Sequence, residues 1–248
     1  MILSKGQMIL AAVIVYLMVM AAGAAAYFVI SKQPPAEPPA QTASTAKAKK
    51  EKPELTEAQK KEQAEKEAQE KAKAERRQQR EKDMENLAKG MRQKIEGVVT
   101  TYSYRHDEKE PGVHLWVALE VGDGMVLDMD VLYYYTIHDP IASAWIFGDH
   151  LDIEADGIIT TLSFDPTKRQ KKVASDAEWL SERYTLRARK EAVEALRKVG
   201  NAGSASITYY QEGGKSRTQS LTSEEIQEIH NMVTLYDLYQ EEQKDDGW

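Results

Sequence analysis

The chain contains no cysteine, and it has only three phenylalanines and five histidines among its 248 residues. Without cysteine it can form no disulfide, no thiolate nucleophile and no cysteine-ligated zinc site. The HExxH pattern of zinc hydrolases, the GxSxG pattern of serine hydrolases and the glycine-rich phosphate-binding patterns are also missing. The sequence therefore predicts a protein that is not an enzyme and that holds no cofactor or metal ion.

Positive charge is scarce in the last part of the chain. The net charge is −7, but residues 1–53 carry +4, residues 54–96 carry +1 and residues 97–248 carry −12. A region with such an acidic balance repels the phosphate backbone of nucleic acids. We therefore expect no nucleic-acid partner.

One long uncharged run is present, at residues 8–30, with the sequence MILAAVIVYLMVMAAGAAAYFVI. As a helix it would be roughly 35 Å long, enough to cross the hydrocarbon core of a bilayer. We expect a short tail over residues 1–7 and a transmembrane anchor over residues 8–30. The alternative is a cleaved signal peptide with a cleavage site near Ala26, but the run stays apolar beyond that point.

A transmembrane anchor and a cleaved signal peptide would both lead to export of the rest of the chain. A short segment before a first apolar run usually stays in the cytoplasm, which predicts a single-pass membrane protein with its C-terminal domain outside the cytoplasm. Lys32 and the lysines between residues 47 and 50 favour the opposite orientation.

Two polar segments follow the predicted anchor. Residues 31–55 are rich in proline, alanine and lysine, and predict an extended linker. Residues 56–96 are rich in glutamate, lysine, glutamine and alanine, and predict a charged helical stalk supported by Glu-to-Lys pairs at four-residue spacing. A coiled coil needs apolar a and d positions over several heptads, whereas residues 57–83 offer only alanine, so most of the stalk should be a solvated spacer.

The end of the predicted stalk has a different pattern. An apolar stripe formed by Met84, Leu87, Met91 and Ile95 should dock on the domain that follows, or on a second copy of the stalk. We favour docking on the domain.

The order of segments over residues 1–96 resembles the layout of TolA- and TonB-type envelope proteins, which also have an anchor, a proline-containing linker and an Ala/Lys/Glu-rich helix before a small C-terminal domain. The resemblance implies a protein of the cell envelope. In those families a polar residue in the membrane helix couples to a proton-driven motor, whereas residues 8–30 offer only Tyr16 and Tyr27.

Residues 97–240 predict an α+β domain, an antiparallel sheet with two packed helices. Residues 113–121 and 127–138 alternate between apolar and polar side chains, as half-buried strands do. The sequence Gly122-Asp123-Gly124 joins them as a hairpin. Because both strands must bury the same face, the numbers of paired residues must add to an even sum, which predicts a loop of three residues with a left-handed glycine, or a loop of five.

Further strands are predicted at residues 97–106 and in hairpins over residues 150–164 and 204–221. The polar second strand of the last hairpin suits the edge of a sheet.

Two capping boxes predict the helices of the domain. Ser175 and Glu178 start a helix over residues 176–199, and Thr222 and Glu225 start a helix that ends near residue 240. Residues 241–248 then form an acidic C-terminal tail.

Two groups of carboxylates are candidate metal ligands. The best candidate set is Asp149, His150, Asp152, Glu154 and Asp156; the last three share one face of a predicted strand and could bind calcium. Asp128 and Asp130 also share a face. We favour a solvated strand face in both cases, because alternation of this kind places polar residues outward anyway.

One group of side chains does not suit a face that is exposed to solvent. The side chains of His114, Trp116, Leu132 and Tyr134 gather on the outer face of the predicted hairpin in either register. Aromatic side chains on a nominally polar face need cover from another element or from a partner. The predicted helix over residues 176–199 could cover them, and a partner-binding patch is the alternative.

Three hypotheses for function follow. The first is a membrane-anchored envelope protein, held in the lipid bilayer by residues 8–30, that presents its α+β domain to a protein partner as a subunit or scaffold of an envelope assembly; it could also be a homo-oligomer. The second is an extracytoplasmic sensor or small-ligand-binding module. The third is an enzyme with an unrecognised, carboxylate-based site.

Overall fold

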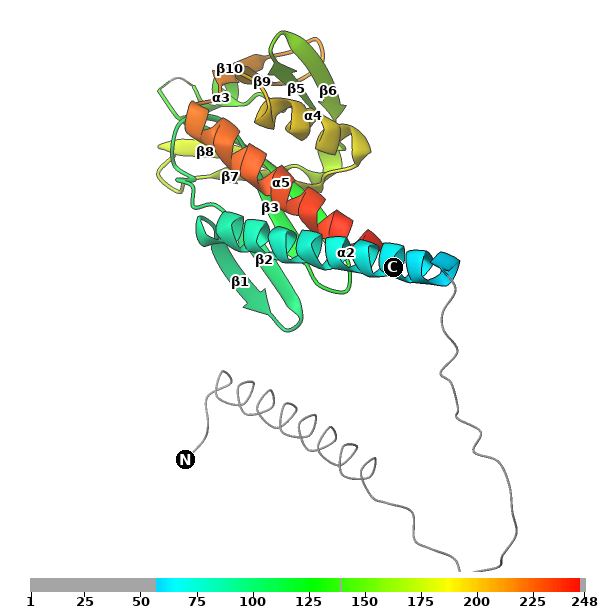
Figure 1. Cartoon of the computed structure of the whole chain (residues 1–248). Coiled ribbons are helices and arrows are strands. Elements are labelled where there is room, and N and C mark those ends of the chain that lie inside the picture. Colours follow the sequence, from blue (N-terminus) through cyan, green and yellow to red (C-terminus); the bar gives the residue numbers. More distant parts are fainter. Residues whose placement is uncertain (1–56, 139, 246–248) are drawn as a thin grey trace, which may run out of the picture. The chain divides into compact units, whose positions relative to one another are not determined.

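The computed structural model describes residues 57–138 and 140–245 (Figure 1). The predicted tail, anchor and linker, which cover residues 1–55, lie outside the described residues. Among the helices that are described, none is long and apolar enough to cross a membrane. Residues 56–248 form one compact unit of the α+β class. The unit contains two antiparallel sheets, whereas the sequence predicted one.

Sheet A is the larger of the two. It has six strands in the order β1-β2-β3-β4-β8-β7, and each neighbouring pair is antiparallel. The strands are β1 (Arg92–Glu96), β2 (Val99–Ser103), β3 (Gly112–Val121), β4 (Met125–Thr136), β7 (Gln170–Val173) and β8 (Trp179–Arg187).

The predicted hairpin is formed by β3 and β4. Val121 pairs with Met125, so the sums of paired residue numbers are even, as the apolar pattern required, and the loop has three residues, one of the two lengths that the pattern allowed. Neither glycine of this loop has a positive φ, so the expected left-handed glycine is wrong. The amide of Gly122 instead donates to the carbonyl of Gly124 at 2.9 Å and closes the loop.

Sheet B has four strands in the order β10-β9-β5-β6. It is built from two hairpins that the sequence predicted, β5 (His150–Ala155) with β6 (Ile158–Ser163), and β9 (Ala205–Tyr210) with β10 (Ser216–Ser220). Asp156 and Gly157 both have positive φ, 49° and 82°, as the two-residue turn between β5 and β6 requires. The polar strand β10 lies at an edge, as expected.

The last helix is α5 (Ser223–Asp245), and its predicted capping box is present. The amide of Glu225 donates to Thr222 Oγ1 at 3.2 Å, and the amide of Thr222 donates to the Glu225 carboxylate at 2.7 Å. The helix continues five residues beyond the expected end at 240, so the prediction of a separate acidic tail from 241 is wrong over the described residues. Asp245 forms an ion pair with Arg80, which ties the end of α5 to helix α2 (Glu57–Lys89).

The helix predicted over residues 176–199 is wrong in its first half. Residues 179–187 form strand β8, and helix α4 covers only Lys190–Gly200. Leu180 and Tyr184 are four residues apart, a spacing that fits one face of a helix and also one face of a strand. Pairing of all of β8 with residues 128–136 of β4 decides in favour of the strand.

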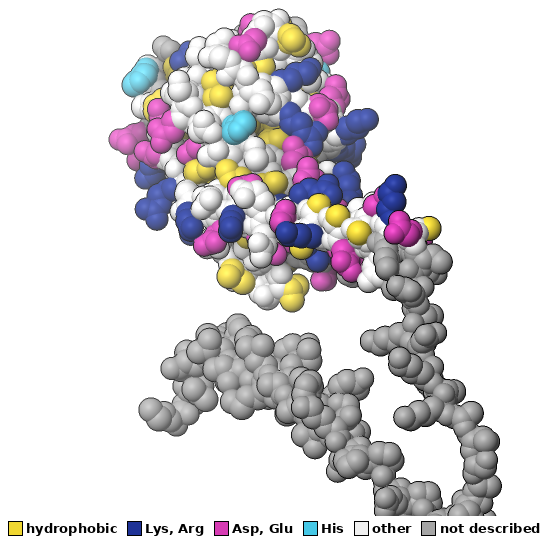
Figure 2. All heavy atoms as spheres, viewed as in Figure 1, with side chains coloured by type: hydrophobic (Ala, Val, Ile, Leu, Met, Phe, Trp, Pro, Cys, Tyr) yellow, Lys and Arg dark blue, Asp and Glu magenta, His cyan; other side chains and the backbone are white. Residues whose placement is uncertain are grey.

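The predicted stalk helix also ends earlier than expected. Helix α2 (Glu57–Lys89) stops before Gly90, and residues 92–96 form the edge strand β1. Gly97, with a φ of 64°, starts the two-residue turn that leads into β2. Lysine, arginine and acidic side chains are interspersed along α2 (Figure 2).

The apolar stripe at the end of α2 docks on the domain for three of its four residues. Met91 is buried, and Met84 and Leu87 pack against the main core. Ile95 is 70% exposed on β1, so the prediction is wrong for this residue.

One continuous hydrophobic core lies between the two sheets and the helices. Helix α4 contacts β5 and α5, helix α5 contacts β3 and β4, and α2 runs beside α5 (Figure 1). Short helices α3 (Ile141–Ala144) and η1 (Pro166–Lys168) lie in the connections. We call the face of sheet A that packs on this core its inner face, and the opposite face its outer face.

A carboxylate is buried on the inner face. Glu182 of β8 is 1% exposed. It accepts hydrogen bonds from the three consecutive amides of residues 146–148, at 2.8, 2.8 and 3.1 Å, and Tyr209 Oη lies 2.9 Å from its Oε2. A buried charge is tolerated when it is satisfied in this way. The Glu182 side chain therefore fixes the segment that connects α3 to β5.

Gly148 belongs to the same network. Its carbonyl accepts from Arg169 Nη1 at 2.8 Å and from Tyr184 Oη at 3.1 Å. A Cβ atom at this position would lie only 2.3 Å from the ring of Tyr209. Burial, and then the Glu182 carboxylate, raise the pKa of Tyr209, which keeps its hydroxyl protonated as a donor.

Candidate functional site

The four side chains of the predicted patch do share the outer face of sheet A. In the observed register His114 lies directly opposite Leu132, and Trp116 and Tyr134 lie on the same face. All four are buried, with exposed fractions between 3% and 8%. They are therefore not an open surface, and the question is what covers them.

The cover is not the helix that the sequence predicted. The segment between β2 and β3 folds over the patch: the ring of His106 stacks on Trp116 with centroids 4.7 Å apart, and His114 Nε2 lies 2.9 Å from the carbonyl of Glu110. On the other side Trp179 of β8 stacks on Tyr134 at 5.4 Å. Trp116, Leu132, Tyr134 and Trp179 thus form a second apolar cluster, separate from the main core.

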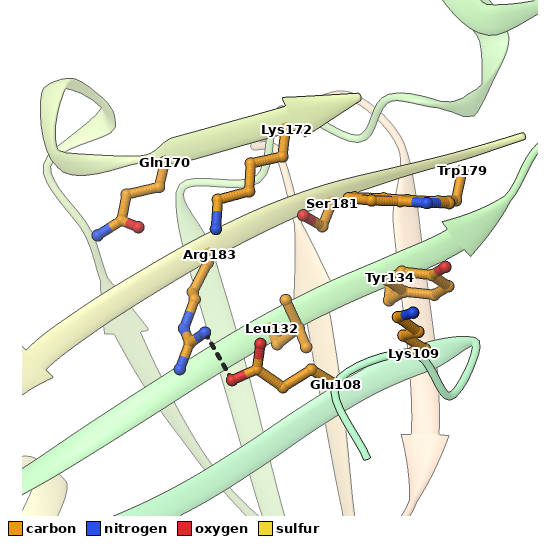
Figure 3. A pocket seen from close by; sticks show the side chains of 9 residues that line it. All are labelled: Glu108, Lys109, Leu132, Tyr134, Gln170, Lys172, Trp179, Ser181 and Arg183. Carbon is orange, nitrogen blue, oxygen red and sulfur yellow. Dashed lines mark hydrogen bonds and ion pairs between the residues drawn. The ribbon is translucent and has the colours of Figure 1, made fainter. Parts of the chain in front are cut away.

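A pocket of about 120 Å³ opens beside this cluster (Figure 3). Its walls come from β4, β7, β8 and the segment between β2 and β3. The lining residues are Glu108, Lys109, Leu132, Tyr134, Gln170, Lys172, Trp179, Ser181 and Arg183. Leu132, Tyr134 and Trp179 give the pocket an apolar wall, and the long polar side chains form its rim.

The rim is positively charged within an acidic domain. Arg183 donates to both oxygens of Asp130 and to Glu108 at 3.0 Å, and its bond to Asp130 raises the pKa of the guanidinium. Its charge is therefore compensated. Lys109 and Lys172 form no ion pair in the part of the chain that the structure describes. These two ammonium groups are available to an anionic ligand.

The dimensions and chemistry of the pocket limit its use. Drug-sized ligands and cofactors generally occupy ~300–1,000 Å³, so a pocket of about 120 Å³ suits a single side chain or a small carboxylate. The lining residues include Ser181 but no histidine, so this serine has no imidazole base among them. Burial raises the pKa of Tyr134, which keeps its hydroxyl neutral at physiological pH.

The acidic residues around β5 do not converge on one point. Asp152 accepts from Thr161 at 2.6 Å, Glu154 accepts from Ser206 at 3.2 Å, and Asp156 accepts from the amides of residues 203 and 204. Over residues 57–138 and 140–245 no group of three acidic or histidine side chains is placed to hold a metal ion. On the other sheet, Asp130 is occupied by Arg183.

Most of the pocket was not identified from the sequence. Leu132 and Tyr134 were, but Trp179, Ser181 and Arg183 were missed because β8 was interpreted as a helix. Read as a strand, residues 179–187 alternate, with Leu180, Glu182 and Tyr184 on one face and the pocket residues on the other. This alternation is the pattern in the sequence that could have identified β8 as a strand.

Comparison with protein-family models, with curated proteins and with solved structures finds no match to this chain.

Proposed function

We propose that this chain is a single-pass membrane-anchored protein of the cell envelope, whose α+β domain binds another protein through the pocket on the outer face of sheet A. The pocket is the observation that carries the proposal: it has an apolar aromatic wall, a lysine rim and the volume of one side chain. Residues 8–30 supply the predicted anchor in the lipid bilayer.

Protein recognition fits this geometry better than other functions. Binding hot spots are enriched in tryptophan, tyrosine and arginine, set in small pockets with a polar rim. Trp179, Tyr134 and Arg183 have those positions here. Lys109 and Lys172 select for a carboxylate, so the partner segment should present an acidic residue next to an apolar one.

The second candidate is an extracytoplasmic module that binds a small carboxylate. The same two unpaired lysines favour it, because a free carboxylate of a few atoms would fit about 120 Å³. An enzymatic activity is not proposed, because the pocket offers no activated nucleophile.

Two neighbouring lysines of β7 provide a matched test. Lys172 lines the pocket, whereas Lys171 lies over the Phe147 ring, 5.5 Å from its centroid, on the inner-face side of the same strand. Both are exposed, so reversing either charge should leave the fold intact. We expect the full-length Lys172→Glu variant, purified from membranes after mild cross-linking, to lose the stoichiometric partner that wild type and Lys171→Glu retain.

The same purification separates the two candidates. If no protein partner is recovered with wild type, and small carboxylates raise the unfolding temperature of wild type but not of Lys172→Glu, the small-ligand function replaces the proposed one. If Lys171→Glu and Lys172→Glu lose the partner equally, the pocket is not the binding site.

A further inference from the structure

The two sheets have four edge strands, and these edges differ in charge. Strand β1 carries Arg92, Lys94 and Glu96, β7 carries two lysines and β10 carries Arg217. Such charges discourage pairing with another strand. Strand β6, with the sequence IITTLS, carries none, and it lies at the outer edge of sheet B (Figure 1).

Strand β6 also exposes apolar side chains. Ile158 is 57% exposed and Ile159 is 60% exposed, which is unusual for residues of this size in a regular element. β-branched residues without proline or charge are the composition that pairs most readily with a further strand.

The direction of the free backbone groups follows from the hydrogen bonds to β5. The amide of Phe164 donates to the carbonyl of Asp149 at 2.7 Å, and hydrogen-bonded pairs alternate along an antiparallel ladder. Residues 158, 160 and 162 therefore direct their amides and carbonyls toward β5. Ile159, Thr161 and Ser163 direct theirs away from the sheet, where no strand pairs with them among the described residues.

We propose that β6 is a self-association edge: two copies of the chain pair their β6 strands antiparallel about a two-fold axis, and the two copies of sheet B become one continuous sheet. An antiparallel strand pair between identical edges is self-complementary, as a two-fold interface must be. This proposal concerns sheet B and does not depend on the pocket of sheet A.

Among the antiparallel registers that keep the outward backbone groups opposed, two give the largest overlap of the strands. Either Thr161 lies opposite its own copy, or Thr160 does. In the first register Ile158 meets the other copy's Phe164, and in the second it meets Leu162, so both registers cover the exposed Ile158 side chain with an apolar neighbour.

Charge explains why β6, rather than another edge, is the one that pairs. Self-pairing of β7 would place its lysines close to those of the other copy across the ladder, which is destabilising. Strands β1 and β10 also carry charged side chains, whereas β6 carries none. Across a β6 pair the nearest acidic strands, β5 and its copy, are three strand spacings apart, or about 14 Å. This is beyond the Debye length of ~8 Å at physiological ionic strength, so their repulsion is largely screened.

The absence of cysteine makes a direct test possible. Thr161→Cys is introduced into the full-length chain in membranes, and Thr218→Cys, an exposed threonine on β10 at the other edge of the same sheet, is the matched control. A short bis-maleimide should convert Thr161→Cys into covalent dimer and leave Thr218→Cys monomeric. Equal dimer from both variants, or from neither, would overturn the proposal.

A pair of variants with opposite charges at position 161 distinguishes loss of pairing from misfolding of a variant. In chains that also carry Ile159→Cys as the reporter, Thr161→Lys alone and Thr161→Glu alone should each lose the cross-linked dimer. Their co-expression should restore it, because the opposite charges then lie directly opposite each other in the first register and diagonally in the second. Failure of the mixture to restore the dimer would contradict the proposed pairing.

Discussion

The two faces of sheet A differ in how completely their charged side chains are paired. Two adjacent residues of β8 show the difference. Glu182 points to the inner face and is enclosed, with three amides and a tyrosine around its carboxylate. Arg183 points to the outer face, where Asp130 and Glu108 compensate it and two lysines nearby have no ion-pair partner among the described residues. The inner charge is satisfied completely and serves the fold, whereas the outer face keeps unused charge beside an apolar wall, which is what a binding site needs.

The largest expected effect comes from removing the inner charge. Glu182→Ala leaves three amides without an acceptor, two of them buried and one partly buried, so we expect a loss of about 3–5 kcal/mol in the free energy of unfolding. Urea unfolding of the compact unit, residues 56–248, measures it. Arg183→Ala, on the partly exposed face, should cost only about 1 kcal/mol. Equal losses for the two variants would remove the distinction between the faces.

A steric change tests the inner face independently of charge. Gly148→Ala places a methyl group 2.3 Å from the Tyr209 ring, in a segment held on both sides, so overpacking should cost about 2–3 kcal/mol. Gly124→Ala is the control, since a Cβ at that position meets no atom within 4 Å and its φ is not positive. A difference below about 0.5 kcal/mol between these two variants would mean that the segment is not rigid.

A smaller effect is expected at the segment that covers the outer cluster. Glu228 of α5 lies 3.8 Å from His106, which stacks on Trp116. Burial, with Glu224 and Glu225 nearby, raises the Glu228 pKa to about 7 from 4.5. The folded state therefore binds more protons than the unfolded state between these values, so the contribution of Glu228 is full below pH 4.5 and is lost as pH rises through 7.

Glu228→Gln should remove this dependence and make the unit more stable than wild type at pH 8. We expect about 1 kcal/mol, because partial exposure of the side chain screens the interaction. Burial lowers the pKa of His106, which changes the pH dependence of stability in the opposite direction to Glu228. His106 is present in both the wild type and the variant. The difference in stability between the two proteins therefore reports the contribution of Glu228. Glu241→Gln, exposed on the same helix, should show no such difference, and a similar gain there would point to net charge instead.

The sequence predicted the parts of the fold that depend on local pattern. The parity of the β3–β4 register followed from which residues had to be buried, and the cap of α5 followed from Thr222 and Glu225. Turns such as Asp156-Gly157 were located because few residues other than glycine tolerate positive φ there.

The wrong predictions of secondary structure lie where the apolar spacing fits both a helix and a strand, or where pairing with a strand distant in the sequence determines the structure. Leu180 and Tyr184 fit either a helix or a strand, and only β4, which is far away in the sequence, selects the strand. Residues 92–96 continue a charged helical composition, yet pairing with β2 makes them a strand. Three of the nine residues that line the pocket were missed with the first of these errors, because they come from β8.

The central claim is that the outer-face pocket contacts a partner protein, and site-specific photo-cross-linking tests it most directly. A photoreactive residue replaces Gln170, which is exposed and lines the pocket, in the full-length chain in living cells. The same residue at Lys171, on the inner-face side of β7, is the control. We predict one discrete adduct from position 170 that disappears when Lys172→Glu is added, and none from position 171. Adducts of equal yield from both positions, or an adduct that Lys172→Glu leaves unchanged, would contradict the account.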